Sequence, residues 1–333
     1  MFRYETLSIT RKNFVDRTIQ EFPGITNQIT REQINQVMRN HNLSWPQWLT
    51  IPDNKQGKSI WGFPEVTGSE GVVVNPVIEE TDEEILDKIK ERFGAIDLCV
   101  KSAAENKMRS VIISGPPGVG KSFGVTRVLE NFSGCNYVFA SGKSAATGLY
   151  KLLYENRFPN CVIVLDDIDS IFDSIDSLNI LKKCCDRSKV RKISWLTETK
   201  FVSDEDGEEI PKSFEFEGNI IFITNIDFDE QISKGSKLSP HFDALMSRSF
   251  YISLGIRSKR EMVLRIKQVV KEEKMLRQEG LSEQEENKIL DFIHKNANRL
   301  RDLSLRMCAN LSDLYKIDPD NFEHLAKVTC FRV

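Results

Sequence analysis

One glycine-rich segment of the chain has the residue types and the spacing to bind phosphate groups. Gly115, Gly120, Lys121 and Ser122 occupy the defining positions of the pattern G-x-x-x-x-G-K-S. Glycines let backbone N–H groups approach phosphate oxygens, the lysine can reach the β- and γ-phosphates, and the serine hydroxyl can ligate Mg²⁺. An apolar β-branched run precedes the segment and a helical pattern follows it, so a bound phosphate would lie at a helix N-terminus. The segment therefore predicts binding of a nucleoside triphosphate with Mg²⁺. The residues expected to contact the nucleotide are Gly115, Pro116, Pro117, Gly118, Val119, Gly120, Lys121, Ser122 and Phe123.

Two further apolar runs end in polar side chains suited to the same chemistry. Residues 161–169 read Cys-Val-Ile-Val-Leu-Asp-Asp-Ile-Asp, and a buried parallel strand would bring Asp166 to the carboxyl edge of a sheet. We expect Asp166 to hold Mg²⁺ through a water molecule and Asp167 to polarise the attacking water. Residues 219–225 form another β-rich run, and its last residue, Asn225, could orient that water from the neighbouring strand.

Several arginines follow these runs. Arg248 lies between a helical pattern and a strand pattern at residues 250–254. The rest of the chain has helical periodicity at residues 259–274, 283–296 and 299–313. Three arginines gather near the start of the last helical pattern, at Arg299, Arg301 and Arg306.

In this order and spacing, the motifs resemble those of the AAA+ ATPase module over about residues 81–333. The resemblance implies an α/β fold in which helices flank a parallel phosphate-loop sheet and a helical lid follows it. It implies ATP and Mg²⁺ as cofactors, with residues 115–122 as the Walker A loop and Asp166 with Asp167 as the Walker B pair. It also implies that Asn225 is sensor 1 and Arg301 is sensor 2. Arg299 and Arg306 remain rivals for the sensor 2 role.

The resemblance assigns to Arg248 the role of an arginine finger that enters the site of a neighbouring subunit. Such a finger is worth about 10³–10⁵ in rate for phosphate-loop enzymes, and its action in trans requires a ring or a helical oligomer. One residue departs from the family pattern, because most members carry glutamate where this chain has Asp167. The shorter side chain sets the carboxylate back by one methylene, which favours slow hydrolysis stimulated by a partner.

A hairpin formed by residues 191–202 and 210–216 is predicted between the strand that ends at Asp166 and the strand that ends at Asn225. It resembles the pre-sensor-1 hairpin of one AAA+ branch, in which the hairpin points toward the pore of a ring; an ordinary surface hairpin is the alternative. Leu149 and Tyr150 lie where the family places an aromatic pore loop, yet they also fit a helix that packs on the sheet, which we favour. Residues 148–156 and 193–196 resemble ATPases of large tailed bacteriophages, and this resemblance assigns no role.

Residues 1–65 have the element order of a winged helix–turn–helix. Helices are predicted at residues 11–22 and 31–40, the second with a capping box from Thr30 and Gln33, and a short third helix after Ser44. Residues 51–63 then read as a hairpin with its turn at residues 53–57. Trp48 and Trp61 are expected in the core, while Lys55 and Lys58 would contact phosphates of DNA. A small helical domain that docks a protein is the alternative.

Length and composition are those of an ordinary globular protein of 333 residues, 40% hydrophobic and 29% charged. The first 63 residues carry eight Lys/Arg and five Asp/Glu, a net charge of +3, and since the whole chain has −3 the remainder has −6. The seven cysteines show no C-x-x-C spacing, and no run of 18 apolar residues occurs, so we expect a cytoplasmic protein with reduced thiols, no metal cluster and no membrane contact. If a phage encodes it, this is the host cytoplasm.

These features predict four segments and one leading function. The segments are a winged-helix-like domain at residues 1–65, a linker at 66–84, the AAA+ core at 85–256 and the helical lid at 257–333. The leading function is an oligomeric ATPase that remodels a DNA- or protein-containing target chosen by residues 1–65. One alternative is a slow, nucleotide-gated loader or regulator that binds DNA. Another is a protein unfoldase whose N-terminal domain binds an adaptor.

Overall fold

The computed structural model describes residues 4, 7–25, 27–41, 43, 45–64, 80–196, 200–203 and 207–332. Its contacts divide the chain into two compact units, Met1–Glu79 and Glu80–Val333. Residues 66–79 of the expected linker lie outside the described residues. No helix in the described part of the chain combines the length and the apolar character needed to cross a membrane.

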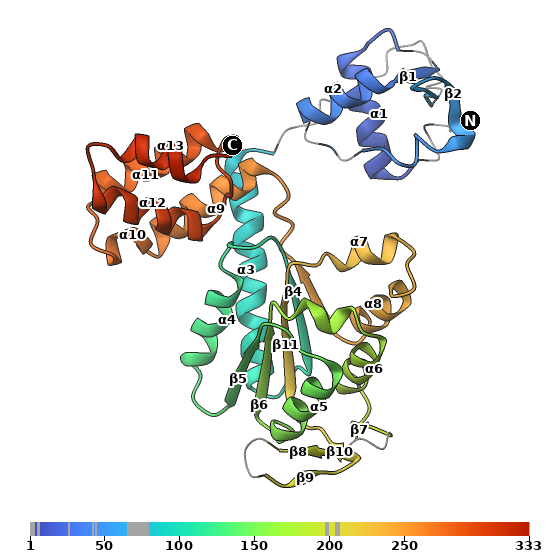
Figure 1. Ribbon diagram of the computed structural model, residues 1–333, viewed down its shortest axis with the longest axis vertical. Coiled ribbons are helices and arrows are strands. Elements are labelled where there is room, and N and C mark those ends of the chain that lie inside the picture. Colours follow the sequence, from blue (N-terminus) through green and yellow to red (C-terminus); the bar gives the residue numbers. More distant parts are fainter. Residues whose placement is uncertain are drawn as a thin grey trace. The chain divides into compact units, whose positions relative to one another are not determined.

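The first unit packs two helices against a small antiparallel sheet with strand order β1-β3-β2 (Figure 1). Its core includes Phe14, Val15, Ile34 and Trp61. The expected capping box is confirmed, since Thr30 N–H donates to Gln33 Oε1 over 2.9 Å and Gln33 N–H donates to Thr30 Oγ1 over 3.3 Å. The elements are α1 (Ile9–Glu21), β1 (Gln28–Thr30), α2 (Arg31–His41), the 3₁₀ turn η2 (Pro52–Asn54), β2 (Lys55–Gly57) and β3 (Ile60–Gly62).

Two predictions for this unit are wrong. Residues 45–50 form a single turn, in which the N–H groups of Leu49 and Thr50 both donate to Pro46 O, instead of a third helix; Ser44 lies outside the described residues. The hairpin turn falls after residue 57, not at 53–57, because the Asn54 side chain donates to the carbonyls of Leu49 and Gly62 and holds residues 52–54 in a 3₁₀ turn. The winged-helix assignment therefore stays a prediction. Trp61 lies in the core as expected, and Trp48 packs against it with its ring at right angles to that of Phe14.

The second unit is built on a five-stranded parallel sheet with strand order β12-β4-β11-β6-β5. The three central strands are apolar runs with side chains buried on both faces, as parallel sheets covered by helices require. The strands are β4 (Ser110–Ser114), β5 (Asn136–Ser141), β6 (Cys161–Asp166), β11 (Asn219–Thr224) and β12 (Phe250–Ser253).

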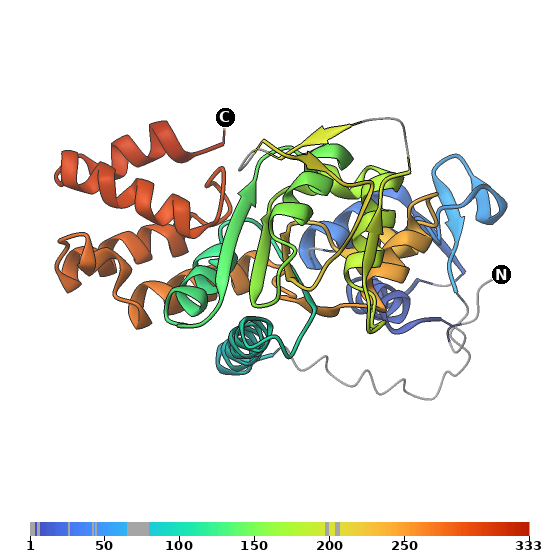
Figure 2. The same cartoon turned by 90° about the horizontal axis from the view of Figure 1, so that it is seen from below.

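Helices cover both faces of this sheet. On one face α3 (Asp82–Ala104) and α4 (Lys121–Glu130) pack against it, and Figure 2 shows α3 nearly end-on at that side. Thr81 starts α3 with a capping box to Glu84. The opposite face packs against elements that share a second core cluster. These are α5 (Ala146–Glu155), η3 (Asp169–Phe172), α6 (Ile175–Cys184), α7 (Phe228–Ser233) and α8 (Ser239–Met246).

The helical lid, residues 257–333, follows β12 and packs in the same core cluster as α3. The helical periodicity predicted for it is confirmed, but the helix expected from residue 299 begins at Leu305, where Ser304 is the N-cap and accepts from Met307 N–H. The lid helices are α9 (Lys259–Glu272), α10 (Met275–Gln278), α11 (Glu283–Asn296), α12 (Leu305–Ile317) and α13 (Phe322–Cys330).

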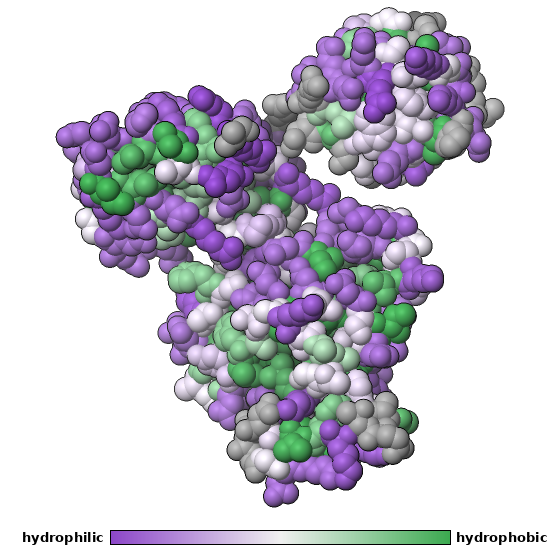
Figure 3. Space-filling model, in the orientation of Figure 1, coloured by the Kyte–Doolittle hydropathy of each residue, from purple (hydrophilic) through white to green (hydrophobic). Residues whose placement is uncertain are grey.

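The predicted hairpin is present between α6 and β11. Strand β7 (Lys192–Ser194) pairs with β10 (Ser213–Glu215), and β8 (Phe201–Val202) pairs with β9 (Glu209–Ile210), both antiparallel; residues 197–199 and 204–206 lie outside the described ones. The expected packing of Tyr150 is confirmed: its side chain is fully buried against this hairpin, and its hydroxyl donates to Pro211 O over 2.9 Å. Apolar side chains reach the surface at this end of the core (Figure 3), and Leu196 and Val202 are among them.

Candidate nucleotide-binding site

The phosphate loop (residues 115–120) connects the carboxyl end of β4 to the first residue of α4. Gly118 and Gly120 have positive φ angles of 71° and 97°, a backbone conformation that L side chains rarely adopt. A Cβ atom at Gly118 would also lie 2.3 Å from Cβ of Ser304 in the lid. Glycine is therefore required at Gly118 both by the backbone angle and by the closeness of the lid.

Lys121 points back over this loop and uses all three of its N–H donors. Its Nζ donates to Gly115 O over 2.7 Å, to Pro116 O over 3.0 Å and to Asn225 Oδ1 over 2.8 Å. Burial lowers the pKa of Lys121 to about 8, although nearby carboxylates such as Asp167 oppose the shift. The ammonium group is thus held at the loop, and any phosphate that binds it must replace some of these acceptors.

Ser122 and Asp166 form the pair of oxygen donors expected for a magnesium ion. Ser122 Oγ donates to Asp166 Oδ1 over 2.9 Å, and burial raises the pKa of the aspartate. A hydroxyl and a carboxylate are hard oxygen ligands, and Mg²⁺ is commonly bound by one or two protein groups together with phosphates and water. The two side chains therefore fit Mg²⁺ bound beside the loop.

Asp167 and Asn225 meet at the end of the neighbouring strands. Asp167 has a φ of 53°, a left-handed conformation that aspartate tolerates better than most residues, and its N–H donates to Ile223 O. Asn225 Nδ2 donates to Asp167 Oδ1 over 3.0 Å while its Oδ1 accepts from Lys121. One amide side chain thus joins the lysine of the loop to the carboxylate expected to polarise water.

Sequence reasoning missed a second link between these two strands. Thr224 Oγ1 donates to Asp169 Oδ1 over 2.6 Å, and Ile226 N–H donates to Thr224 Oγ1. Burial raises the pKa of Asp169. The available signal was positional, because Thr224 directly precedes Asn225 and Asp169 lies two residues after Asp167.

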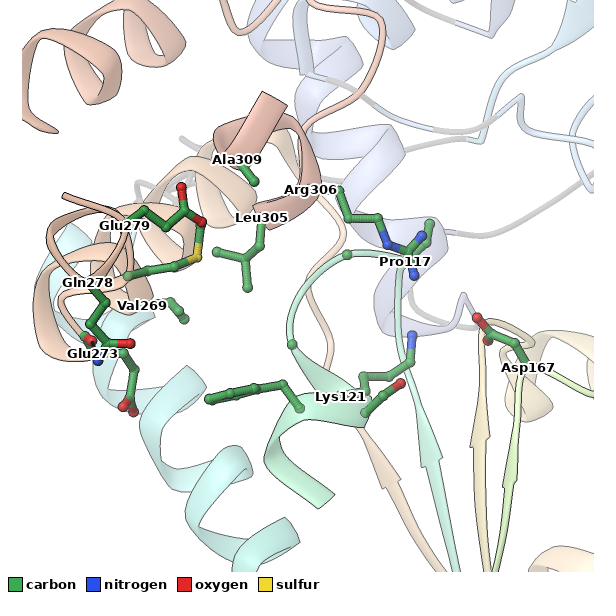
Figure 4. A pocket seen from close by; sticks show the side chains of 15 residues that line it. Pro117, Lys121, Asp167, Val269, Glu273, Gln278, Glu279, Leu305, Arg306 and Ala309 are labelled. Atoms are coloured by element: carbon green, nitrogen blue, oxygen red, sulfur yellow. Dashed lines mark hydrogen bonds between the residues drawn. The ribbon is translucent and has the colours of Figure 1, made fainter. Parts of the chain in front are cut away.

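A cavity of about 420 Å³ opens between the phosphate loop and the lid (Figure 4). Lys121, Asp167 and Arg306 lie together at one end of it, whereas Glu273, Gln278 and Glu279 lie at the other. Apolar side chains line the space between these ends. One of these side chains, Phe123, was predicted to contact the nucleotide. The sequence did not indicate the others, which are Val269, Met275, Leu305 and Ala309. A charged end beside an apolar wall matches the two parts of a nucleotide.

The expected placement of Arg301 is wrong. Its side chain donates to Thr329 O and its backbone N–H to Cys330 O, so it joins two segments of the lid and does not line the cavity. Arg306, one of the two rival candidates, lies in the first turn of α12 and lines the charged end of the cavity. The difference arises because α12 starts at Leu305, which leaves Arg301 in the preceding turn.

Arg248 lies at the opposite edge of the sheet from the phosphate loop. Ser110 Oγ donates to Arg248 O at the first residue of β4, and the loop follows the last residue of this five-residue strand. Four steps along a strand span about 13 Å. The Arg248 side chain is half-buried, with Nη1 donating to Ala244 O over 2.6 Å. Arg248 is therefore remote from the cavity of its own chain.

A family model and a sequence relative match this chain. The model of the ATPase family associated with various cellular activities (AAA) matches residues 111–224, which include the loop and the ends of β6 and β11. Over 272 residues, the chain is 34% identical to an uncharacterized 36.7 kDa protein from the nrdC-mobD intergenic region of Enterobacteria phage T4, covering 81% of this chain and 82% of that protein. The chain belongs to the AAA family of ATPases.

Two solved structures are similar to this AAA protein at low sequence identity. The Holliday junction branch migration motor RuvB of Thermotoga maritima is 15% identical, with a TM-score of 0.40 over 73% of this chain and 68% of that chain. NtrX of Brucella abortus in complex with ADP is 14% identical, with a TM-score of 0.38 over 71% of this chain and 51% of that chain.

The lowered pKa of Lys121 predicts a pH-dependent affinity of this AAA protein for ATP. Above about pH 8 the free protein carries a neutral Lys121, and since phosphates favour the charged form, binding then requires uptake of a proton. The affinity should be greatest below pH 8 and fall by up to about tenfold per pH unit above it. Titration calorimetry from pH 7 to 10 measures this. The variant Lys121→Arg stays charged throughout and is the control; equal pH profiles for the two proteins would contradict the prediction.

The positions of the two lid arginines predict different effects of their removal. Arg306→Ala should weaken ATP binding by about 10- to 100-fold, since a hydrogen bond to a charged group contributes about 1.5–3 kcal/mol. Arg301→Ala should leave the ATP affinity unchanged within about twofold, because its partners are lid carbonyls. Equilibrium binding of a fluorescent ATP analogue measures both. Loss of binding in the Arg301 variant alone would refute the assignment.

Proposed function

We propose that this AAA protein binds ATP with Mg²⁺ and hydrolyses it as an oligomer to remodel a target that contains DNA or protein. The observation that carries the proposal is the division of the catalytic groups between two edges of one sheet. Lys121, Asp167 and Asn225 are hydrogen-bonded together at the carboxyl edge. Arg248 lies at the other edge, beside the start of β4.

Each group at the carboxyl edge has a defined part in hydrolysis. Lys121 and the loop N–H groups bind the β- and γ-phosphates. Ser122 and Asp166 would hold Mg²⁺, which would supply charge neutralisation at the phosphates. Asp167 and Asn225 orient the water that attacks the γ-phosphorus. Asn225 contacts both Lys121 and Asp167. A γ-phosphate that binds Lys121 in place of Asn225 therefore also changes the position of the Asp167 carboxylate.

The position of Arg248 supports an oligomer. Since it lies some 13 Å from the loop of its own chain along β4, it can stabilise the charge on a transferred phosphate only from a neighbouring subunit. A contact of this kind joins two different surfaces of identical chains, so it produces a ring or a helical assembly. The site is then complete only at the interface.

A slow nucleotide-gated switch is the second candidate, and one observation favours it. Asp167 is exposed and has a short side chain, and one of its carboxylate oxygens already accepts a hydrogen bond from Asn225. Such a loader or regulator would assemble with ATP and turn over only when a partner releases Asp167. The turnover number of the wild-type protein without a target separates the candidates, because values of about 1–10³ per second, typical of enzymes, would exclude the switch.

The N-terminal unit is proposed to choose the target. Arg11 and Arg31 stack over Trp48 and Trp45 with 5.5 Å between the guanidinium carbon and the ring centroid in each case, and Lys55 and Lys58 are exposed on the hairpin. Exposed cations near a β-hairpin suit DNA phosphates. The single turn at residues 45–50, where a third helix was expected, suits a protein target instead, as in an unfoldase with an adaptor-binding domain. Because the T4 relative is a phage protein, we extend the proposal to a phage-encoded protein that acts in the host cytoplasm.

The shared site predicts recovery of activity when two inactive variants are mixed. Arg248→Ala should bind ATP normally and lose about 10³-fold or more in turnover, and Asp167→Asn should also be inactive. In an equal mixture about a quarter of the interfaces combine an intact Asp167 with an intact Arg248, so about a quarter of the wild-type rate should return. Phosphate release assays measure it. A mixture no more active than its components would contradict the trans arrangement.

The charge on the N-terminal hairpin predicts how the full-length protein would bind DNA. Exchanging both lysines (Lys55→Glu with Lys58→Glu) should weaken binding and lower the slope of log affinity against log salt by about 2, since each lysine–phosphate contact contributes about one unit. Fluorescence anisotropy at several salt concentrations measures the slope. The matched control reverses two exposed lid lysines, Lys295 and Lys327. Undetectable DNA binding by the wild-type protein, with or without ATP, would favour the protein target.

A further inference from the structure

The lid places a buried cation beside the phosphate loop. Arg265 lies in the middle of α9 and is only 9% exposed. No ion pair between described residues includes it; the carboxylates of Glu272 and Glu273 act on it only at longer range. Burial lowers its pKa to about 10, so the guanidinium keeps its charge at neutral pH. A buried charge without an ion-pair partner is costly, which points to a role beyond packing.

The contacts of Arg265 are directed at the loop. Its Nε donates to Val119 O over 3.2 Å and its Nη1 donates to Gln268 Oε1 over 2.9 Å. The guanidinium carbon lies 3.5 Å from the centre of the Phe93 ring of α3. The ring of α3 and the glutamine of α9 thus fix the plane of the guanidinium, and the Nε–H donor is directed at the loop carbonyl.

A second lid donor holds the preceding carbonyl of the loop. Leu305 N–H, at the first residue of α12, donates to Gly118 O over 2.8 Å. Two consecutive peptide groups of the phosphate loop, 118–119 and 119–120, are therefore held by the lid through their carbonyl oxygens. One donor comes from α9 and the other from α12.

The direction of these carbonyls decides the direction of the neighbouring N–H groups. All described peptide bonds are trans, and in a trans peptide the C=O and the following N–H point in opposite directions. Holding the carbonyls of Gly118 and Val119 against the lid thus turns the N–H groups of Val119 and Gly120 away from it. These two N–H groups find no acceptor among the described residues and stay available to an anion.

We propose that Arg265 is a positioning residue which, together with Leu305 N–H, orients the phosphate loop so that its N–H groups face the β-phosphate. Arg265 does not touch the nucleotide; it acts through Val119. The inference rests on the proposed function, because it concerns how the same site recognises phosphates. It follows that the position of the lid and the affinity for the β-phosphate are coupled.

The test compares nucleotides with and without a β-phosphate. Arg265→Met keeps the volume and the contact with Phe93 but removes the donor to Val119, so the ADP affinity should fall by about 10- to 100-fold. The AMP affinity should change by less than about threefold, because AMP lacks the β-phosphate that these N–H groups face. Lys90→Met is the matched control, since it removes an ion pair between α3 and α9 (Lys90–Glu272, 3.1 Å) without touching the loop. Calorimetric titration of the full chain gives the ADP and AMP affinities of the wild type and of both variants.

A second pair of variants tests the backbone donor independently of Arg265. Leu305→Pro removes the N–H that binds Gly118 O, and proline is tolerated at the first position of a helix, where this residue stands. Leu305→Ala also removes the leucine side chain beyond Cβ, but it keeps the backbone N–H that the proline variant lacks. The proline variant should therefore lose about tenfold more ADP affinity than the alanine variant, with equal AMP affinities. If Arg265→Met does not fold, this pair alone decides.

The outcomes separate the inference from the function on which it rests. A wild-type protein that binds neither ATP nor ADP would overturn both. Wild-type binding together with an unchanged ratio of ADP to AMP affinity in Arg265→Met, and equal ADP affinities of the proline and alanine variants, would overturn the inference alone. A parallel loss of ADP and AMP affinity would show a structural role for Arg265 and would also overturn it.

Discussion

The parallel pairing of β11 with both β4 and β6 is the constraint on which the site depends. In this register Thr224 lies opposite Ser114 and Ile223 lies opposite Asp166, so the three strands end at one level. The phosphate loop, the two aspartates and Asn225 all leave the sheet there, within hydrogen-bonding distance of one another. A shift of one residue in β11 would turn every buried side chain of that strand to the opposite face. The buried isoleucines and Phe222 therefore fix the positions of the polar groups that follow them.

The lid forms the part of the nucleotide-binding cavity that the sheet and its loops do not. Residues of α9, α10 and α12 supply the apolar wall of the cavity, and Arg306 adds a positive charge at its phosphate end. The carbonyls of Gly118 and Val119 in the phosphate loop are bound by lid donors. The loop is thus held from two sides, by Lys121 within the core and by Arg265 and Leu305 from the lid. Because of this double attachment, a movement of the lid changes the geometry of the loop as well as the access to the cavity.

The parts of the site that could be predicted from the sequence are those set by adjacent residues. The spacing of Gly115 to Ser122 and the carboxylates after an apolar strand are local signals, and the structure brings Lys121, Asp166 and Asn225 together as expected. The lid arginine that lines the cavity could not be identified in this way, because the start of α12 depends on contacts of residues 299–301 with the segment at residues 330–332, including the bridge Leu300–Phe331. Arg265 gave no signal either, since a basic residue in an amphipathic helix normally faces water. It is covered by the loop and by Phe93, which are distant along the chain.

The order of these elements along the chain has a consequence for biosynthesis. The N-terminal unit and all five strands of the core sheet are made before residue 254, whereas the wall of the cavity extends to Ala309. A nascent chain that has just completed its sheet carries the Walker motifs but lacks the donors that hold Gly118 and Val119. The nucleotide-binding site is therefore complete only after the lid has been synthesised and has left the ribosome. In the proposed oligomer, whose assembly would require the nucleotide, this order of synthesis would exclude unfinished chains.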